Sequence, residues 1–497
     1  MNSFWSLENV KAALGGTWLA RPEVPSLAPL GGASIDTRSI KPGEVFFAFR
    51  GEHVDGHAFV ETALEKGAGL IVIDRPQSLP DALLKRIATT HPVVQVSDTA
   101  TALLKAGAAY RKTLESTKVI AIGGSNGKTT TTRLIQQVLS SALRGTTSPK
   151  SFNNSIGVPL TILQAKPIDQ FLLCEIGTNS PGEIAALAEV LQPDIAVITS
   201  IGREHLELLG SIEGVAREEA SLLQSLRPYG CAILNADAPC LADAAKRALA
   251  DGRCKTTTVI TFGSAPTADL RLTQITPSID GLLLTLNGNI EIRVPLIGEH
   301  NALNVIAAFA VGRRMGLSHE QICTALATAR GPEMRMELNH LSLDAQPLTI
   351  INDAYNANPD SMAAGLHAFA QLTRNSNRRR VAVLGNMLEL GDDAPAMHAE
   401  VGQLLCDLTC VDLLICIGHL MGHAAAVAER CLSAAKVVRY DSLSPTIAAE
   451  IAAMFQPNDI VFLKGSRGMA LERVLACAKD RCDSPHIVSG VRAKTAV

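Results

Sequence analysis

The stretch KVIAIGGSNGKTTTTRLI (residues 118–135) decides how this chain folds. Its apolar start, 118–122, is typical of a buried β-strand, a glycine-rich turn follows, and GKT at 127–129 opens a helix. Glycines let backbone N–H groups close around phosphate oxygens, and the helix N-terminus adds partial positive charge. Lys128 can reach β- and γ-phosphate oxygens, and the Thr129 hydroxyl can bind Mg²⁺. The stretch therefore predicts a phosphate-binding loop, or P-loop.

The loop is one residue shorter than the strict P-loop pattern. That pattern requires glycine at position 122, which is Ile122, whereas the glycine of this chain is Gly123. An ordinary glycine-rich turn is the alternative interpretation, but GKTT at a strand–helix junction favours nucleotide binding. The residues expected to contact the nucleotide are Gly124, Ser125, Asn126, Gly127, Lys128, Thr129 and Thr130.

Short apolar runs alternate with amphipathic stretches along most of the chain. This alternation predicts the α/β class, with parallel sheets covered by helices on both faces. Asn287–Gly288, between two alternating runs, predicts a β-hairpin. The expected strands lie in the runs 118–124, 170–177, 194–202, 380–386, 413–418 and 460–466. Breaks in the pattern near 113–118 and 331–348 predict domains at 1–115, 116–332 and 333–497.

Composition excludes several classes of protein. The 497 residues are 47% hydrophobic and 19% charged, so bulk disorder is excluded. A formal net charge of -3 gives no sign of a nucleic-acid-binding protein or a polybasic membrane protein. The N-terminus shows no signal peptide, and no apolar run reaches the roughly 18 residues of a membrane span. We therefore expect a cytoplasmic protein without membrane insertion.

Eleven cysteines are scattered through strand-like and helix-like runs, which predicts reduced, buried thiols and no disulfide framework. One group could form a metal site, because two histidines four residues apart lie near three cysteines. A structural zinc site would require a closed tetrahedral ligand set, whereas small apolar-like cysteines are common in cores, so the core interpretation is favoured. The group consists of Cys406, Cys410, Cys416, His419 and His423.

A carboxylate and an imidazole follow two further predicted strands. Glu175 comes directly after the apolar run FLLC, and His205 follows the run DIAVITSIG (194–202). Taken singly, each is more often a helix cap or a surface residue. The carboxyl ends of parallel strands meet at one edge of a sheet, so their position beside a P-loop favours a Mg²⁺ site that includes Thr129.

Segments along nearly the whole chain resemble the ATP-dependent Mur ligases of peptidoglycan synthesis. Singly, GKTT or HNALN is weak, but the segments together and in this order are specific. They are DTRSIKPGEVFFAF (36–49), DGHAFVETALEKGA (55–68), GGSNGKTTTT (123–132), SFNNSIGVPLTIL (151–163), EIGTNSPGEIAAL (175–187), EHLELLGSIEGVA (204–216), IGEHNALNVIAA (297–308), INDAYNANPDSM (351–362), VAVLGNMLELG (381–391) and FLKGSRGMALERV (462–474).

The resemblance implies a fold and a reaction. The fold would comprise an N-terminal domain that holds a uridine nucleotide, a central P-loop ATPase and a C-terminal Rossmann-like domain. The reaction would join D-alanyl-D-alanine to the tripeptide carboxylate of UDP-N-acetylmuramoyl-tripeptide, with ATP converted to ADP and phosphate. A carboxylate is a poor acyl donor, so it would first become an acyl phosphate, with Lys128 and Mg²⁺ supplying positive charge. We expect a monomer.

The resemblance also implies residue roles. Thr129 and Glu175 would hold the Mg²⁺ that binds ATP, and His205 would help to hold a second Mg²⁺. Arg335 would reach the γ-phosphate when the domains close. The other implied contacts are Asn301, Asn304 and Asp353 with adenine or ribose, Asn153 and Asn154 with the muramoyl substrate, Asp36, Thr37 and Arg38 with uridine, and Lys464, Ser466 and Arg467 with the dipeptide or the tripeptide carboxylate.

The sequence departs from the family at one position. In several Mur ligases a lysine some fourteen residues after the position of His205 is carbamylated and helps to bind the second Mg²⁺. Here Glu219 stands at that place in GVAREEASLL. Our hypothesis is that Glu219 supplies the negative charge without CO₂, through a water if needed. A solvent-facing helical position is the equally weighted alternative.

Four other functions stay open from sequence. The preceding ligase, which adds diaminopimelate or lysine, usually carries an Asp-Asn-Pro-Arg motif that is absent here. Folylpolyglutamate synthase shares the ATPase core but does not explain the first third of the chain. A non-catalytic nucleotide switch and a P-loop kinase are disfavoured by the substrate-type residues beside the loop.

The Asn-rich DAYNANP segment (353–359) is also compatible with a plain turn.

Overall fold

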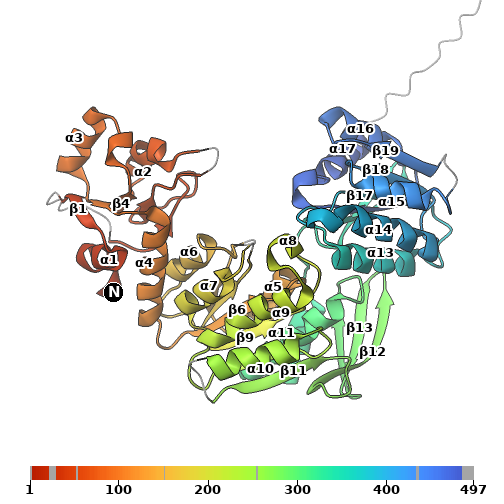
Figure 1. Ribbon diagram of the computed structural model, residues 1–497, viewed down its shortest axis with the longest axis horizontal. Helices are drawn as coiled ribbons and strands as arrows, with labels where there is room; N and C mark the ends of the chain where they lie inside the picture. Colours follow the sequence, from red (N-terminus) through yellow and green to blue (C-terminus); the bar gives the residue numbers. More distant parts are fainter. Residues whose placement is uncertain are drawn as a thin grey trace, which may run out of the picture. The chain divides into compact units, whose positions relative to one another are not determined.

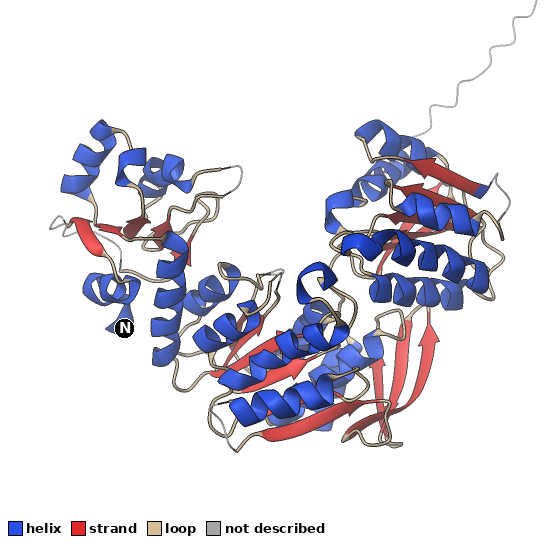
Figure 2. Ribbon diagram, in the orientation of Figure 1, coloured by secondary structure: helices blue, strands red, loops and turns tan. Residues whose placement is uncertain are grey.

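The computed structural model describes residues 3–21, 29–51, 54–149, 152–178, 180–252, 256–432 and 436–483. Three β-sheets, each with helices packed beside it, make this an α/β protein, as the sequence predicts (Figures 1 and 2). The contacts group the chain into two compact units. The larger unit comprises Met1–Ile275, Leu284–Val294 and Ala302–Ala329, and the smaller comprises Thr276–Leu283, Pro295–Asn301 and Arg330–Val497.

The first sheet has five strands in the order β1-β5-β4-β3-β2, of which only the β1–β5 pair is antiparallel. Short apolar runs such as LIVI at β4 are fully buried because helices cover them. The elements are α1 (Leu7–Leu14), β1 (Thr17–Ala20), β2 (Ala33–Ser34), β3 (Val45–Phe47), α2 (Val60–Glu65), β4 (Leu70–Ile73), α3 (Asp81–Thr90), β5 (Val93–Gln95) and α4 (Thr99–Thr113).

Helix α4 joins the first sheet to the second within the larger unit. Asp98 caps its N-terminus by accepting a hydrogen bond from the Thr101 N–H at 2.6 Å. Further along α4, the Tyr110 hydroxyl donates to the Ala165 carbonyl at 2.6 Å, and buried Arg111 donates to the Leu191 carbonyl at 2.8 Å. These buried side-chain bonds attach α4 to the helices of the second sheet.

The second sheet has nine strands in the order β14-β13-β12-β11-β10-β9-β6-β8-β7. Its elements are β6 (Lys118–Gly123), α5 (Lys128–Ser140), β7 (Gly145–Thr147), α6 (Gly157–Gln164), β8 (Phe171–Glu175), α7 (Glu183–Leu191), β9 (Ile195–Ile198), α8 (Leu206–Leu209), α9 (Ile212–Ala220), β10 (Cys231–Asn235), α10 (Leu241–Asp251), β11 (Thr258–Gly263), β12 (Leu270–Ser278), β13 (Gly281–Leu286), β14 (Ile290–Val294), α11 (Asn301–Arg314) and α12 (His319–Ala327).

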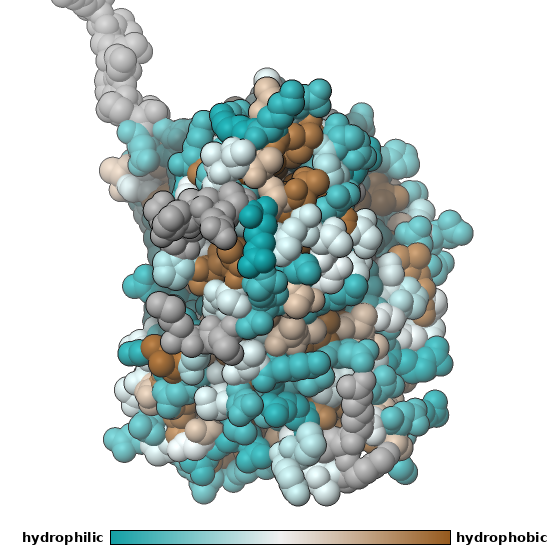
Figure 3. All heavy atoms as spheres, turned by 90° about the vertical axis from the view of Figure 1, so that its left-hand side faces the viewer, coloured by the Kyte–Doolittle hydropathy of each residue, from teal (hydrophilic) through white to brown (hydrophobic). Residues whose placement is uncertain are grey.

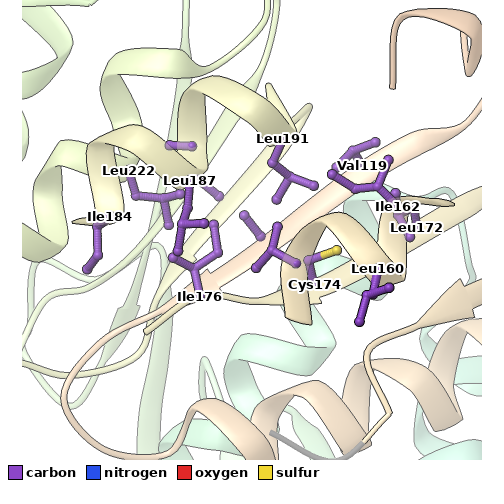
Figure 4. Close-up of a cluster of buried hydrophobic side chains, with 14 of the residues drawn as sticks. Val119, Leu160, Ile162, Leu172, Cys174, Ile176, Ile184, Leu187, Leu191 and Leu222 are labelled. Atoms are coloured by element: carbon purple, nitrogen blue, oxygen red, sulfur yellow. The ribbon is translucent and has the colours of Figure 1, made fainter. Parts of the chain in front are cut away.

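Strand β6 lies between β8 and β9 and pairs with both in parallel. The register places Ile122 beside Glu175 and Gly123 beside Ile198, so the three strands end at the same edge. Aliphatic side chains on one face of β6 and β8 pack against side chains of α6, of α7 and of the segment after α9 (Figure 4). Those labelled there are Val119, Leu160, Ile162, Leu172, Cys174, Ile176, Ile184, Leu187, Leu191 and Leu222.

The hairpin predicted at Asn287–Gly288 is confirmed. Strands β13 and β14 are neighbours in the sheet, and in the three-residue connection between them Asn287 and Gly288 have φ angles of 49° and 76°. Asparagine and glycine are the residues that adopt such positive φ angles most readily.

The third sheet lies in the smaller unit and has the order β15-β16-β20-β17-β18-β19. Only the β15–β16 pair is antiparallel. The elements are β15 (Glu337–Leu343), β16 (Gln346–Asp353), α13 (Pro359–Thr373), β17 (Arg380–Gly385), α14 (Ala394–Leu408), β18 (Leu413–Ile417), α15 (Met421–Ala428), β19 (Val437–Tyr440), α16 (Pro445–Ala453), β20 (Ile460–Lys464) and α17 (Glu472–Asp483). All six predicted strands are therefore confirmed, each within its expected run.

The expectation of reduced cysteines is wrong for one pair. Cys406, near the end of α14, forms a disulfide with Cys431, which follows α15, because helix packing brings their Cα atoms within 5.4 Å. Eight other cysteines within the described ranges are free thiols, and Cys254 lies outside those ranges. The described residues contain no group of three or more His, Cys, Asp or Glu side chains suited to a metal.

Exposed hydrophobic side chains are scattered. On the face seen in Figure 3, hydrophobic atoms form separate patches between hydrophilic ones. None of the helices in the described part of the chain is long and apolar enough to cross a membrane.

Candidate functional site

The P-loop follows β6, and two of its glycines are sterically required. Gly124 has a φ angle of 116° and lies against Thr199, and Gly127 has a φ angle of 86° and lies against the Asn304 amide. A Cβ atom at either position would overlap those side chains. The segment after β9 holds the loop from the other side, because the Asn126 N–H donates to the Ser200 hydroxyl at 2.8 Å.

Lys128 opens helix α5 with its side chain turned over the loop. Its Nζ donates to the Gly124 carbonyl at 2.5 Å and to the Ser125 carbonyl at 3.4 Å. Its Nζ also lies 3.9 Å from a carboxylate oxygen of Glu204, and only 15% and 12% of the two side chains are exposed. The lysine charge therefore stands in a sheltered place among the backbone groups that would surround a phosphate.

Thr129 and Glu175, both expected to hold Mg²⁺, are in contact with each other. The Thr129 hydroxyl donates to Glu175 Oε2 at 3.0 Å, and the Asn153 amide donates to Oε1 of the same carboxylate at 3.1 Å. Glu175 is 2% exposed and Thr129 is 6% exposed. The pairing follows from the sheet, because β6 and β8 are neighbours and their ends coincide. A hydroxyl and a carboxylate in contact offer the oxygen ligands that Mg²⁺ prefers.

Glu219 is buried under the P-loop, so the solvent-facing alternative is wrong. Its Oε2 accepts a hydrogen bond from the Gly124 N–H at 2.6 Å, and the side chain is 1% exposed. Its other oxygen, Oε1, is buried and has no hydrogen-bond partner among the described residues. Burial raises the pKa of Glu219, an effect that the nearby Lys128 charge partly offsets.

The neighbouring Glu218 has a different task. Its two carboxylate oxygens accept hydrogen bonds from the Gly182 and Ile184 N–H groups, at 2.8 and 3.0 Å, at the start of α7. A carboxylate at that position satisfies backbone groups that lack partners within the helix. Of these two adjacent glutamates of α9, Glu218 therefore caps a helix and Glu219 supports the P-loop.

His205 and Asn154 lie at helix starts near the predicted site. His205 precedes α8 with a φ angle of 48°. Asn154 accepts hydrogen bonds from the Ile156 and Gly157 N–H groups at 3.2 and 2.9 Å, so its carbonyl oxygen caps α6. Its predicted contact with a muramoyl substrate thus has to use the remaining amide group.

Asn304 is buried beside the P-loop, where its Oδ1 accepts a hydrogen bond from Thr131 at 3.2 Å. Asn301, at the start of α11, donates to the Ile297 carbonyl at 2.8 Å. Both asparagines were expected to contact adenine or ribose, and both side chains also bond within the protein.

Two residues that were expected to bind different ligands form an ion pair with each other in the smaller unit. Lys464 Nζ lies 2.5 Å from Asp353 Oδ2, with 3% and 14% of the two side chains exposed. They come from adjacent strands β20 and β16, whose register pairs them directly. No local pattern indicates this contact, because the two strands are far apart in the chain.

The other predicted residues of this unit lie in nearby loops. The Ser466 hydroxyl donates to the Ala357 carbonyl at 3.1 Å, and exposed Arg467 pairs with Glu472 at 2.9 Å. The Arg335 guanidinium lies 4.4 Å from the centre of the Tyr355 ring, a cation–π contact.

The residues predicted to bind uridine occupy one turn after β2. Asp36 pairs with Arg38 at 2.7 Å, and the hydrogen bond from the Arg38 side chain lowers the pKa of Asp36. Arg38 itself is 90% exposed. The Thr37 carbonyl accepts a hydrogen bond from Lys66 at 2.8 Å. The turn is thus shaped by its own residues and presents a guanidinium to solvent.

Sequence reasoning missed Glu204 and the capping role of Glu218. Glu204 directly precedes His205 in EHLEL, so its position after β9 was a usable signal. No local signal distinguished Glu218 from Glu219, because α7 and the P-loop approach α9 only in the folded chain.

Comparisons with known proteins agree with this architecture. Family models match three segments: Mur ligase family, catalytic domain (30–111), Mur ligase middle domain (122–312), and Mur ligase, glutamate ligase domain (334–467). A UDP-N-acetylmuramoyl-tripeptide–D-alanyl-D-alanine ligase of Bacillus subtilis (strain 168) is 34% identical over 484 residues, or 97% of this chain and 99% of that protein.

A ligase with the same name from Mycobacterium tuberculosis (strain CDC 1551 / Oshkosh) is 32% identical, over 91% of this chain and 93% of that protein. Among solved structures, crystal structure I of MurF from Acinetobacter baumannii matches with a TM-score of 0.80 and 28% identity, covering 97% of this chain and 99% of that one. Likeness of this extent, over both chains and all three sheets, shows that this chain belongs to the Mur ligase family.

Proposed function

We propose that this chain joins D-alanyl-D-alanine to the tripeptide carboxylate of UDP-N-acetylmuramoyl-tripeptide, as the names of its relatives state for those proteins. In the first step a carboxylate oxygen attacks the γ-phosphorus of ATP, and ADP leaves. In the second step the dipeptide amine attacks the acyl carbon, loses a proton, and phosphate leaves. The products are UDP-N-acetylmuramoyl-pentapeptide, ADP and phosphate. We place the reaction in the cytoplasm, on a monomeric chain.

The P-loop carries this proposal. The loop amides and Lys128 would surround the phosphates of ATP, and the lysine would exchange its present bonds to the loop carbonyls for phosphate oxygens. The attacking carboxylate and the triphosphate are both anions, so their approach requires fixed positive charge. Lys128, already sheltered from solvent beside the loop, can supply that charge.

The residues around the loop fit Mg²⁺. The Thr129–Glu175 pair would hold the ion that binds ATP, and His205 with Glu219 would hold a second ion. For that ion Glu219 Oε1 is a buried oxygen with no hydrogen-bond partner among the described residues. Two protein oxygens suffice at such a site, because Mg²⁺ keeps several waters and substrate phosphates as ligands. When bound, Mg²⁺ polarises phosphoryl oxygens and stabilises the developing charge.

We assign the remaining contacts as the family resemblance implies. Asp36, Thr37 and Arg38 would bind the uridine nucleotide, and Asn153 and Asn154 the muramoyl part. Asn301, Asn304 and Asp353 would contact adenine or ribose, Arg335 the γ-phosphate, and Lys464, Ser466 and Arg467 the dipeptide or the acceptor carboxylate. The corresponding domains would be 1–115, 116–332 and 333–497.

Phosphate release from ATP tests the proposal. The purified chain with Mg²⁺ is given UDP-N-acetylmuramoyl-tripeptide and D-alanyl-D-alanine, together and each alone, with tripeptides that end in diaminopimelate or lysine. The expected result is phosphate release only with both substrates, and a pentapeptide product identified by mass. K128A should abolish release while leaving the fold intact by circular dichroism.

Other outcomes would contradict the proposal. Phosphate release that requires free diaminopimelate or lysine together with UDP-N-acetylmuramoyl-dipeptide would identify the preceding ligase. Phosphate transfer that needs no amine would point to a kinase, and nucleotide binding without turnover would point to a switch.

A further inference from the structure

A cavity of about 340 Å³ lies in the smaller unit, at the carboxyl ends of the neighbouring strands β18 and β19. Helix α15 connects these strands and packs against both of them (Figure 1). In parallel α/β sheets, ligands bind at this end of the strands. None of its lining residues belongs to the P-loop or to the Asp353–Lys464 pair, which lies at the ends of β16 and β20.

The lining has the layout of a nucleoside-binding βαβ unit. Gly418 follows β18 with a φ angle of 103°, α15 comes next, and Asp441 directly follows β19. In dinucleotide-binding folds a glycine turn after the first strand and an acidic residue about 20 residues further on form this unit, and the acid binds ribose hydroxyls. Gly418 and Asp441 both line the cavity.

The first turn of α15 argues against a phosphate in this cavity. The Met421 N–H donates to the Asn386 side-chain oxygen at 2.9 Å. The next two N–H groups, of Gly422 and His423, donate to carbonyls of the preceding turn at 3.1 Å each. The groups that would bind an anion at a helix N-terminus are therefore already occupied. The Arg439 charge, on the cavity wall, is likewise paired with Glu429 at 2.6 Å.

A metal ion is equally disfavoured. The described residues hold no group of three or more metal-binding side chains, and burial raises the pKa of the Cys416 thiol to about 12, so this cavity residue stays protonated. The Asp441 carboxylate also lines the cavity and can accept hydrogen bonds from two neighbouring hydroxyls.

Flat side chains complete the cavity. The imidazole rings of His419 and His423 lie edge to face with centroids 6.3 Å apart, and Tyr440 lines the wall with them. Planar rings of this kind stack on or pack against a planar base. The volume is at the small end of the roughly 300–1,000 Å³ of ligand pockets, so a dinucleotide is too large.

We propose that this cavity binds a ribonucleoside group, with the ribose diol on Asp441 and the base against the two imidazoles. The ligand is a free nucleoside or the nucleoside end of a nucleotide whose phosphates point out to solvent. The proposal assigns a nucleoside site in addition to the P-loop.

Histidine footprinting on the full chain tests it. Diethyl pyrocarbonate modifies exposed imidazoles, and peptide mass mapping reports each histidine separately. Adenosine, uridine and AMP are the probes, with 2′-deoxyadenosine as the probe that lacks the diol. We expect saturable protection of His419 and His423 by at least one ribonucleoside, with unchanged reactivity at exposed His340 of β15.

Two variants locate the site. G422L fills the cavity, because a Cβ atom at Gly422 meets open space, and it should abolish protection. D441N should raise the half-protecting concentration about tenfold, the loss expected for a hydrogen bond to a charged group. Neither residue is part of the proposed ligation site, so phosphate release with both ligase substrates should stay unchanged in both variants.

The proposal is overturned by no protection at millimolar nucleoside, by equal protection with 2′-deoxyadenosine, or by protection that survives G422L. Protection by AMP and not by nucleosides would show that the phosphate is the group that binds, which also contradicts it. Ligation is measured in the same samples, so a failed nucleoside site and a failed ligase assignment give different readings.

Discussion

The Glu219 carboxylate and the Gly124 backbone N–H meet at 2.6 Å beneath the P-loop. One carboxylate oxygen therefore supports the loop, and the other is buried with no hydrogen-bond partner in the part of the chain that the structure describes. An unpaired buried carboxylate oxygen is costly to leave unsatisfied, so a cation beside it would be stabilised. The arrangement makes Glu219 both a positioning group for the loop and a candidate ligand for Mg²⁺.

Replacing this carboxylate should weaken Mg²⁺ use. Glutamine keeps the size and the acceptor for Gly124 but removes the charge, so E219Q should raise the Mg²⁺ concentration for half-maximal phosphate release about tenfold. At saturating Mg²⁺, E219Q should reach a larger fraction of the parent chain's activity than it does at low Mg²⁺. The measurement is a Mg²⁺ titration of phosphate release, with Mn²⁺ binding followed by electron paramagnetic resonance as a readout independent of turnover.

E218Q is the matched control for that titration. It removes the same charge from the adjacent residue of α9, but the Glu218 carboxylate accepts its hydrogen bonds at the start of α7. We expect a loss of stability of about 1 kcal/mol and an unchanged Mg²⁺ requirement. An unchanged requirement in E219Q as well would end the idea that Glu219 acts on the metal.

The stability of the chain should depend on pH through Glu219. Its pKa is raised by burial, so the folded chain binds this proton more tightly than the unfolded chain does. Its contribution to stability is thus fully present below the unfolded pKa and is lost as pH rises through the folded pKa. As the pH rises from 4 to 8, the free energy of unfolding of E219Q should therefore increase relative to that of the parent chain. The measurement is urea unfolding without Mg²⁺. A constant difference across that range would contradict the prediction.

The Asp353–Lys464 pair should behave as a buried ion pair. D353N leaves the Lys464 ammonium, 3% exposed, without its counter-charge, which should lower the free energy of unfolding by about 3–5 kcal/mol. K464M should also destabilise, since it leaves the carboxylate without its counter-charge, with the Met336 N–H as a hydrogen-bond donor. The double variant should lose less than the sum of the two single losses, because it removes both charges. Additive losses in urea unfolding would show that the two groups do not interact.

A count of free thiols before and after reduction tests the Cys406–Cys431 disulfide. The unfolded chain should show two fewer thiols before reduction than after it, with a thiol-specific reagent. Reduction, or the double variant C406S/C431S, should lower the stability of the smaller unit by about 3 kcal/mol, because the bond closes a loop across a sequence separation of 25 residues. Equal thiol counts would show that both cysteines are reduced in the purified protein.

Much of the fold follows from local patterns. The apolar runs became β6, β8, β9, β17, β18 and β20, and Asn287–Gly288 became a hairpin turn, because burial and backbone preference act over a few residues. The Thr129–Glu175 contact was also foreseeable, since neighbouring parallel strands bring their ends to one edge.

Contacts that depend on packing were not predictable from local patterns. The cysteine expectation failed for Cys406 and Cys431 because helix packing decides which sulfurs approach each other. The Asn154 side chain, which we assign to the substrate, also accepts hydrogen bonds from the Ile156 and Gly157 N–H groups at the start of α6, a need that only the folded helix creates.

The sequence by itself determined the α/β class, the strands and the P-loop with its lysine and hydroxyl, because these depend on neighbours in the chain. Only the tertiary structure decided which charges face each other. Glu219 reaches Gly124 across 95 residues, and Lys464 reaches Asp353 across 111. Such contacts depend on strand order and helix packing, which no short stretch of sequence encodes.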